Sequence, residues 1–460
     1  MNVSLHHLAG FLPGSVMVGE PGTLVQRVHT DTRTLQPGDL FVALKGERFD
    51  GNDLLPQAQA AGAAAVLAQS GRIPKGMSGL EVPDTLAALG QLAQGWRGQF
   101  SRPVIAVVGS NGKTTVTQMI AAILRAWHGP AALATQGNLN NHIGVPLTLL
   151  RMTAQHRASV VELGINHPGE TKALAALVQP TVVLINNAQR EHQEFMVDLD
   201  AVVREHADAI ASLPPGQGCL VMPAHESYSA HWLACAARQR VLTFALAAAP
   251  ADIYGTALWH GDGWDLSAHT PAGPVQARLR VAGLHNVKNA LAAIAAAVAI
   301  GAPVAAMAAG LSQFEPVTGR SQLHALHVAG HALTLVNDSY NANPDSVRAA
   351  IDVLADLPGP HLLVLGDMGE VGTQGPQFHR EVGDYARSRG ISRLYTVGAL
   401  SGAAGGQHFE TVPALSAAVC AALPQLGTVL VKGSRFMRME RVVQTVLEQV
   451  QTHKEGAHAA

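Results

Sequence analysis

The chain has 460 residues, and at roughly 150 residues per domain this length predicts about three domains. Charged residues make up only 14%, and 31 Lys and Arg nearly balance 33 Asp and Glu. No strong overall charge is available to bind nucleic acid or an anionic membrane, so we expect neither as a partner. Three cysteines without CxxC or CxxH spacing indicate neither a disulfide framework nor a zinc site.

The sequence shows no sign of export or membrane insertion. Its first residues lack the basic and apolar regions of a secretory signal. Residues 289–311 carry no charge and reach membrane-spanning length, but Gly301-Ala302-Pro303 interrupts them and most are alanine. We therefore predict two helices joined by a turn, no membrane span, and a cytoplasmic protein. We also expect it to be a monomer.

The first predicted domain, residues 1–84, is a small α/β unit. Apolar runs bounded by turn residues predict strands at 38–44 and 65–67, and an alanine-rich helix begins at Leu54 between them.

The second predicted domain, residues 85–312, reads as a doubly wound parallel sheet. A helix at 86–98 precedes a β-branched run at 103–108 that fits a strand buried on both faces. A helix at 114–127 follows, and strands at 158–162 and 182–186 alternate with further helices. Residues 252–281 differ, because a turn between alternating runs predicts an antiparallel hairpin.

The third predicted domain, residues 313–460, is again α/β and resembles a Rossmann-like fold in its alternation. Strand-like runs at 333–336, 361–365, 393–397 and 428–431 are separated by helical segments. The tail after residue 450 carries no clear pattern, so we expect it to be frayed.

The strongest chemical signal lies between the strand at 103–108 and the helix that follows. It is the run Gly109, Ser110, Asn111, Gly112, Lys113, Thr114 and Thr115. Glycines let backbone N–H groups and a helix N-terminus approach phosphates, Lys113 reaches the β and γ phosphates, and Thr114 offers a hydroxyl to Mg²⁺. A strict phosphate-loop pattern would have glycine where this chain has Val107, and the alternative is a glycine-rich turn without a ligand. The run predicts a nucleoside triphosphate site.

Two further residues fit a metal site beside this loop. Glu162 ends a buried-looking strand, and His192 follows the strand at 182–186. Both therefore belong at the carboxyl edge of the sheet, where ligands bind in such folds. Oxygen and imidazole ligands suit Mg²⁺ or Mn²⁺. The alternatives are a loop-capping Glu162 and a His192 without a role.

Four segments together resemble the Mur ligases of peptidoglycan synthesis over nearly the entire chain. They are the loop at 109–115, the run at 137–146, Glu162 with the run at 166–170, and the run at 285–292. Within the family, residues 337–344 and 365–370 resemble the members that join D-alanyl-D-alanine to UDP-N-acetylmuramoyl-tripeptide. The resemblance implies a three-domain ligase that uses ATP and Mg²⁺ and forms an acyl phosphate.

Two alternatives remain at this point. One is a related amide ligase with another acceptor, such as a folylpolyglutamate synthase or a diaminopimelate-adding enzyme. The latter usually carries Asp-Asn-Pro-Arg in its last domain, and this chain does not. The other is an ATP-binding scaffold without catalysis, against which Lys113, Thr114, Glu162 and His192 argue.

The resemblance also implies roles for individual residues. Residues 30–33 and 45–46 would hold the UDP-sugar, although the residue types alone favour the alternative of a capped loop and an exposed turn. Asn286 and Asn289 match residues of the family that face ATP, but they could instead cap the N-terminus of a helix. Arg320 also matches such a position, and its alternative is a solvated surface charge. The implied catalytic residues are Lys113, Glu162, His192 and Arg320. The implied ATP contacts beyond residues 109–115 are Asn286, Asn289, Arg320 and Asp338. The implied substrate contacts are Thr30, Asp31, Thr32, Arg33, Lys45, Gly46, Asn138, Asn140, Asn141, Asn341 and Asn343.

One position departs from the family pattern. Mur ligases usually carry a lysine, carbamylated to supply a carboxylate near a second metal, where this chain has His206. We expect neutral His206 to ligate that metal directly or through water, with Glu205 or Asp208 restoring negative charge. The alternative is a solvent-facing His206 on a helix at 201–211.

Overall fold

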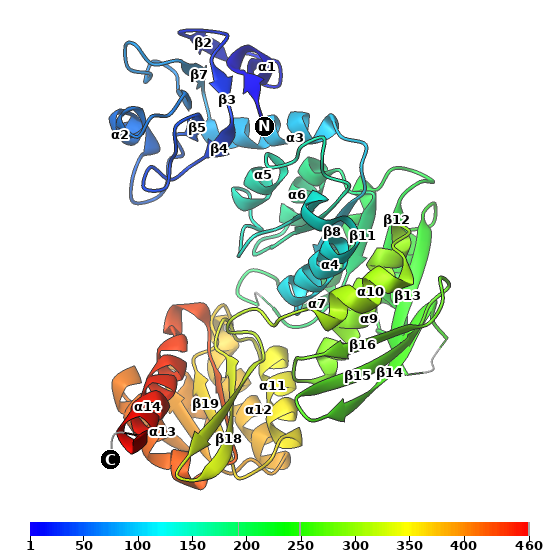
Figure 1. Ribbon diagram of the computed structural model, residues 1–460, viewed down its shortest axis with the longest axis vertical. Coiled ribbons are helices and arrows are strands. Elements are labelled where there is room, and N and C mark those ends of the chain that lie inside the picture. Colours follow the sequence, from blue (N-terminus) through cyan, green and yellow to red (C-terminus); the bar gives the residue numbers. More distant parts are fainter. Residues whose placement is uncertain (192, 248–249, 459–460) are drawn as a thin grey trace.

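The computed structural model describes residues 1–191, 193–247 and 250–458. Figure 1 shows three α/β units stacked along the long axis, with the N-terminal unit (blue) at one end and the C-terminal unit (yellow to red) at the other. Each unit is built on its own sheet, and a two-stranded sheet of β1 (Val3–Ser4) and β3 (Leu24–Val25) completes the first. The three-domain α/β architecture predicted from the sequence is confirmed.

The N-terminal unit has a five-stranded sheet flanked by short helices. Four of its strands form a parallel set, and β2 pairs antiparallel with β7. In sheet order the strands are β2 (Val16–Val18), β7 (Gly79–Val82), β6 (Ala65–Gln69), β5 (Asp39–Val42) and β4 (Arg27–His29). Its helices are α1 (Leu5–Ala9) and α2 (Leu55–Ala60).

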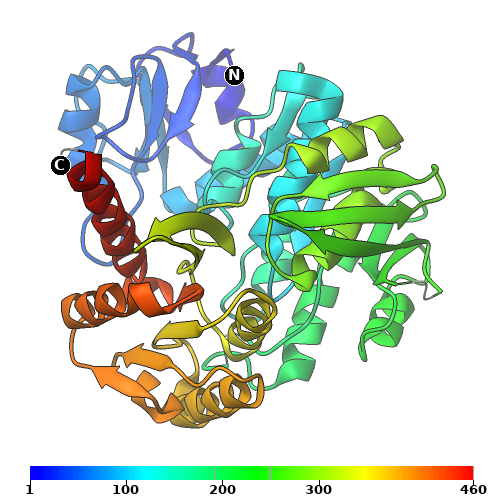
Figure 2. The same ribbon diagram turned by 60° about the horizontal axis from the view of Figure 1, so that its bottom comes forward.

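The central unit has a nine-stranded sheet, parallel except for the predicted hairpin strands at one edge. In Figure 2 these edge strands, β14 to β16, lie side by side (green). In sheet order the strands are β16 (Val275–Leu279), β15 (Gly263–His269), β14 (Ile253–His260), β13 (Arg240–Leu246), β12 (Cys219–Pro223), β11 (Val182–Ile185), β8 (Val104–Val108), β10 (Ala158–Glu162) and β9 (Ala132–Ala134). Its helices are α3 (Thr85–Gly98), α4 (Lys113–His128), α5 (Gly144–Leu149), α6 (Glu170–Val178), α7 (Leu199–Ala207), α8 (Ser229–Cys235), α9 (Leu284–Ala299) and α10 (Val304–Ser312).

The C-terminal unit has a six-stranded sheet covered by two helices on each face. Strand β17 is antiparallel to β18, and the other pairs are parallel. In sheet order the strands are β17 (Gln322–Val328), β18 (His331–Asp338), β22 (Thr428–Lys432), β19 (His361–Gly366), β20 (Leu394–Val397) and β21 (Gln407–Phe409). Helices α11 (Pro344–Asp356) and α12 (Gly375–Ser388) pack on one face, and α13 (Val412–Ala422) and α14 (Glu440–His458) on the other.

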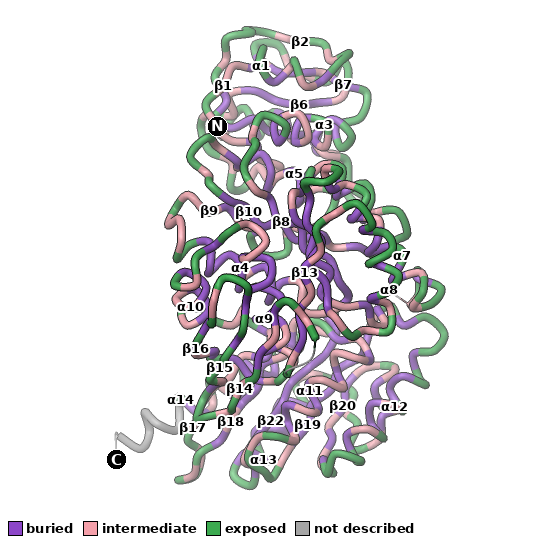
Figure 3. The backbone as a smooth tube through the Cα atoms, turned by 90° about the vertical axis from the view of Figure 1, so that its right-hand side faces the viewer, coloured by how far each residue is buried: buried purple, intermediate pink, exposed green. Residues whose placement is uncertain are grey.

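Strand β8 shows why the apolar runs become central strands. All five of its residues are buried; Val104, Ala106 and Val108 enter one core, while Ile105 and Val107 enter the core on the opposite face. Alternate side chains of a strand point to opposite faces, so a strand covered by helices on both sides needs apolar residues throughout. The central strands accordingly run through the buried interior (Figure 3).

The order of the strands determines where the central sheet can bind a ligand. The chain passes from β8 out to β9, returns to β10 beside β8, and then crosses to β11 on the other side of β8. The loops after β8, β10 and β11 therefore meet at the point where the winding direction reverses, which is where open α/β sheets bind ligands.

Two predictions about helices have different outcomes. The charge-free stretch at 289–311 forms the predicted pair of helices, α9 and α10, and among the described residues no helix is long and apolar enough to cross a membrane. The prediction of a frayed tail after residue 450 is wrong, because α14 continues to His458. Val442, Val446 and Val450 recur on one face of α14 and pack into the core, so the helix is already anchored where the tail begins.

The domains are joined in two different ways. Helix α3 carries Leu89, Leu92 and Trp96 into a core that also contains Leu40 of the N-terminal sheet and Val104 of the central sheet. The C-terminal unit has apolar cores of its own, formed only by residues after 322. Hydrogen bonds and ion pairs join the central and C-terminal units, as is common at interfaces between domains that move relative to one another.

Arg190 is the main polar link between these two units. Its guanidinium donates to both carboxylate oxygens of Asp345 at the start of α11 and to both of Glu381 on α12, at 2.6–3.2 Å. Its backbone N–H also donates to Asp345. The two carboxylates raise the pKa of Arg190, and hydrogen bonding to Arg190 lowers the pKa of Glu381. Paired hydrogen bonds of this kind fix orientation as well as distance.

We predict that Arg190→Ala loosens the docking of the C-terminal unit. The change removes charge-assisted hydrogen bonds worth about 1–3 kcal/mol, so the radius of gyration measured by small-angle X-ray scattering should increase. Arg278→Ala is the matched control, because Arg278 has the same 27% side-chain exposure but pairs with Asp262 and Asp265 inside the hairpin. Identical scattering from both variants and the unaltered chain would contradict a clamping role.

Candidate nucleotide and ligase site

The loop between β8 and α4 has the conformation that its glycines predict. Gly109 has φ +136° and Gly112 has φ +79°, in the region that favours glycine. Gly112 is the N-cap of α4, and no side chain caps this helix. The first N–H groups of α4 are thus left for an anion, at the positive end of the helix dipole.

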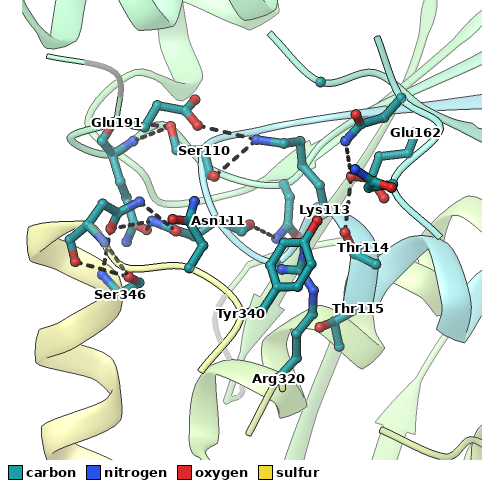
Figure 4. Close-up of a pocket in the computed structure, with 18 of the residues that line it drawn as sticks. Ser110, Asn111, Lys113, Thr114, Thr115, Glu162, Glu191, Arg320, Tyr340 and Ser346 are labelled. Atoms are coloured by element: carbon teal, nitrogen blue, oxygen red, sulfur yellow. Dashed lines mark hydrogen bonds and ion pairs between the residues drawn. The ribbon is translucent and has the colours of Figure 1, made fainter. Parts of the chain in front are cut away.

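Lys113 lies folded against its own loop, with a side chain only 13% exposed. Its ammonium donates to the backbone oxygens of Gly109 and Ser110 and to Glu191 Oε2, the last at 3.2 Å. Figure 4 shows Glu191 and Ser110 converging on this ammonium. A part-buried cation beside helix-terminal N–H groups is the charge arrangement that binds a triphosphate.

Glu162 ends β10 directly beside the loop. Its Oε1 accepts hydrogen bonds from Thr114 Oγ1 at 3.0 Å and from Asn140 Nδ2 at 2.8 Å. The residue is 1% exposed, and its Oε2 has no hydrogen-bond partner among the residues that the structure describes. A buried carboxylate oxygen without a donor, next to a threonine hydroxyl, fits a hard cation such as Mg²⁺.

The segment after β11 holds the loop from the other side. Ser110 N–H donates to Asn187 O and Asn111 N–H to Asn187 Oδ1, while Asn187 Nδ2 returns a bond to Asn111 O. Gln189 adds bonds with the Ser110 hydroxyl and the Asn111 amide. The loop conformation is therefore fixed by residues about 76 to 79 positions away in the chain.

Asn286 and Asn289 extend this hydrogen-bond network into α9. Asn289 donates to Asn286 and accepts from Asn186 Nδ2, which also donates to Asn111 O. Both α9 amides are buried, and Asn286 donates to Ala282 O. The alternative that these residues cap a helix N-terminus is wrong, because the N-cap of α9 is Gly283.

The C-terminal unit contributes charge to the opposite wall. The Arg320 guanidinium lies 4.1 Å from the centre of the Tyr340 ring, and Arg435 lies 4.9 Å from the same ring. Asp338, at the end of β18, accepts from Lys432 Nζ at 2.6 Å and from Ser321 N–H at 2.9 Å. The aromatic ring thus holds two cations beside the cavity.

The two units meet at an amide pair and enclose a cavity of about 940 Å³. Asn343 Nδ2 donates to Asn111 Oδ1 at 2.9 Å, and Asn343 also caps α11 in a capping box with Ser346. Sixteen of the predicted site residues line the cavity: Ser110, Asn111, Gly112, Lys113, Thr114, Thr115, Asn138, Asn140, Asn141, Glu162, Asn286, Asn289, Arg320, Asp338, Asn341 and Asn343.

Comparison with known proteins assigns this arrangement to a family. The chain matches the Mur ligase middle domain over residues 107–297, the Mur ligase glutamate ligase domain over 319–435, and the Mur ligase family catalytic domain over 24–97. The UDP-N-acetylmuramoyl-tripeptide–D-alanyl-D-alanine ligase of Escherichia coli is 41% identical, with 97% of this chain and 99% of that protein covered. The chain belongs to the Mur ligase family.

Two further comparisons agree. The ligase of the same name from Haemophilus influenzae is 37% identical to this Mur ligase, with 94% of this chain and 96% of that protein covered. The crystal structure of MurF from Acinetobacter baumannii superposes with a TM-score of 0.88 at 33% identity, over 97% of this chain and 99% of that one. The resemblance inferred from the motifs is confirmed.

The predicted sugar-binding residues lie apart from this cavity. Residues 30–33 follow β4 and residues 45–46 follow β5, and because these strands are parallel neighbours, the two segments meet at one sheet edge. None of them lines the cavity of the central site. The Arg33 guanidinium and backbone N–H hold the pKa of Asp31 at about 2, and Gly46 N–H closes a turn onto Phe49 O. Their substrate role stays a prediction.

Of the two histidines predicted as metal ligands, the structure describes only one. His192 lies outside the described residues. His206 is fully buried, so the solvent-facing alternative is wrong. Of the two carboxylates expected beside it, that of Glu205 instead accepts from the Gly169 and Thr171 N–H groups at the start of α6, and the role of His206 as a metal ligand stays a prediction. The carboxylate against the His206 ring is that of Glu191, 3.3 Å from Nε2.

The sequence prediction missed Glu191, Lys432, Tyr340 and Arg435, which also line the cavity. Lys432 could have been predicted, because a lysine at the end of a buried apolar strand needs a charged partner or a ligand. Glu191 carried none, because it lies in an irregular segment and its partners are distant in the chain.

We predict that Gly112→Ala disables the nucleotide loop. An added Cβ would lie 2.7 Å from Asn289 Oδ1 and 2.8 Å from Asn186 Nδ2, both held by hydrogen bonds. The positive φ adds roughly 1–2 kcal/mol of strain. Binding of an ATP analogue measured by calorimetry should weaken by at least about tenfold, the equivalent of about 1.4 kcal/mol.

Gly71→Ala provides the control. Gly71 has φ +75°, and nothing lies within 4 Å of its added Cβ, so it has a similar backbone strain without the contacts. Equal analogue binding by both variants would show that the packing around Gly112 is not needed.

Proposed function

We propose that this Mur ligase joins the amine of D-alanyl-D-alanine to the terminal carboxylate of UDP-N-acetylmuramoyl-tripeptide, at the expense of ATP. The observation that carries this function is identity to the E. coli ligase of that name over 97% of the chain. The cavity supports it, because it combines a phosphate-binding loop on one unit with cationic residues on another. The cytoplasmic location and the monomeric state stay predictions.

In the first step, the tripeptide carboxylate attacks the γ-phosphorus of ATP. The bond from that phosphorus to the β–γ bridging oxygen breaks, so ADP leaves and an acyl phosphate forms. Lys113 and the N–H groups at the start of α4 hold the phosphates, and Arg320 faces them from the opposite wall. Positioning and electrostatic stabilisation supply most of the acceleration in such transfers.

Thr114, Glu162 and His192 are the residues that would hold Mg²⁺ or Mn²⁺. The buried Oε2 of Glu162 is the described atom that supports this assignment. When bound, the ion neutralises negative charge on the phosphates. Asn140 orients the Glu162 carboxylate by donating to Oε1, so Oε2 would be available to such an ion.

In the second step, the free amine of D-alanyl-D-alanine attacks the acyl carbonyl. A tetrahedral intermediate forms with a new C–N bond and collapses as its C–O bond to phosphate breaks, so that phosphate leaves and the nitrogen releases a proton. Water would hydrolyse the acyl phosphate, so the C-terminal unit must cover it. The Asn111–Asn343 pair and the Arg190 clamp hold the units together around the cavity. We assign acceptor or tripeptide contacts to Asn138, Asn141, Asn341 and Asn343, and sugar contacts to residues 30–33 and 45–46.

We predict that phosphate release requires both substrates. With ATP and UDP-N-acetylmuramoyl-tripeptide, D-alanyl-D-alanine should support rapid release, while diaminopimelate and glutamate should not. Lys113→Ala should lower the rate at least about 10²-fold, because a charge directed at the transferred phosphoryl group is lost. Phosphate release with glutamate in place of the dipeptide would show that the acceptor belongs to another branch of the family. Phosphate release at the same rate in Lys113→Ala would show that this lysine has no catalytic role.

We also predict that Glu162→Gln raises the Mg²⁺ concentration needed for half-maximal activity by about 10- to 100-fold. The amide keeps the shape and loses the charge that attracts the ion. The measurement is a Mg²⁺ titration of phosphate release, with exposed Glu315→Gln as the charge-matched control. A Glu162→Gln protein with unaltered Mg²⁺ dependence would assign this carboxylate another role.

A further inference from the structure

Glu191 is a buried carboxylate between the loop lysine and a buried histidine. Its side chain is 4% exposed, with Oε2 3.2 Å from Lys113 Nζ and Oε1 3.3 Å from His206 Nε2. Carboxylates are costly to bury, by several kcal/mol each, unless charged or hydrogen-bonding groups compensate. Its two oxygens thus face two different neighbours, one on each side.

Among the described residues, the polar neighbours of the His206 ring are Glu191 and Ser110. Its ring is fully buried, its Nε2 faces Glu191 and the Ser110 hydroxyl at 3.5 Å, and its Nδ1 has no hydrogen-bond partner among the described residues. The ring is carried by α7, which is fixed at its start by the Asp198 cap and to α6 by Glu205. His206 therefore supports Glu191 from a rigid element.

Glu191 in turn fixes Lys113. An ammonium has three donors, and those of Lys113 point to two loop carbonyls and to Glu191. The two carbonyls belong to the same loop as the lysine and are uncharged. Glu191 comes from the segment after β11 and gives the ammonium a charged partner outside its own loop.

We propose that Glu191 is a positioning residue for Lys113 and that His206 acts through Glu191. This inference rests on the proposed ligase function, because it assigns a task within the same site. The carboxylate holds the ammonium in the place from which it stabilises the transferred phosphoryl group. His206 sets the orientation of the carboxylate without contacting substrate.

Steady-state kinetics with varied ATP tests the proposal. Glu191→Gln should lower kcat by about 10- to 100-fold and change the KM for ATP by much less, since the loop N–H groups still bind the phosphates. Glu194→Gln is the matched control, because Glu194 is an exposed acid three residues further along. If the unsubstituted enzyme is active and Glu191→Gln has the same kcat, the positioning proposal is overturned and the ligase function stands. If the unsubstituted enzyme itself is inactive as a ligase, the proposed function is overturned.

A double-mutant cycle separates the two residues. If His206 acts through Glu191, the kcat losses of His206→Gln and Glu191→Gln should not multiply in the double variant. Multiplying losses would overturn the coupling. A His206→Gln enzyme whose kcat recovers fully at high Mg²⁺ would make His206 a metal ligand instead. Unfolding temperatures close to that of the unaltered protein show that each variant has folded.

Discussion

The site depends on keeping one positive charge partly buried in a loop that cannot hold it alone. The N–H groups at the start of α4 and the Lys113 ammonium are the natural partners of phosphates, but a loop with two glycines at positive φ has little conformational preference of its own. Its shape comes from outside, through Asn186, Asn187 and Gln189 after β11 and through Asn289 on α9. The parallel sheet is what brings these segments to one edge.

The two interfaces between the domains differ in chemistry, and this difference determines how firmly each is held. The N-terminal and central units share an apolar core through α3, which resists separation because opening it would expose leucine and tryptophan side chains to water. The C-terminal unit meets the cavity through amides and ion pairs. Water can take the place of such polar partners, so separating this unit costs less than opening the apolar core that joins the other two.

The elements that the sequence predicted well are those specified by local pattern. The buried run at 103–108 and the glycine-rich loop after it became β8 and the start of α4 because burial on two faces and positive φ each demand particular residues. Asp338 shows the limit. Its partner Lys432 lies beside it only through the parallel register of β18 and β22, which joins residues 94 positions apart. The contact of His206 with Glu191 was missed for the same reason, since no residue near His206 in the sequence indicates that neighbour.

Arg190 and Glu191 show how the loop and the domain interface are connected. They are adjacent in the chain, yet Arg190 reaches Asp345 and Glu381 on the C-terminal unit while Glu191 reaches Lys113. Separation of the units must break the Arg190 contacts, and one peptide bond joins that residue to the carboxylate that contacts the lysine. One irregular segment after β11 therefore supplies both the main polar link to the C-terminal unit and the charged partner of the loop lysine.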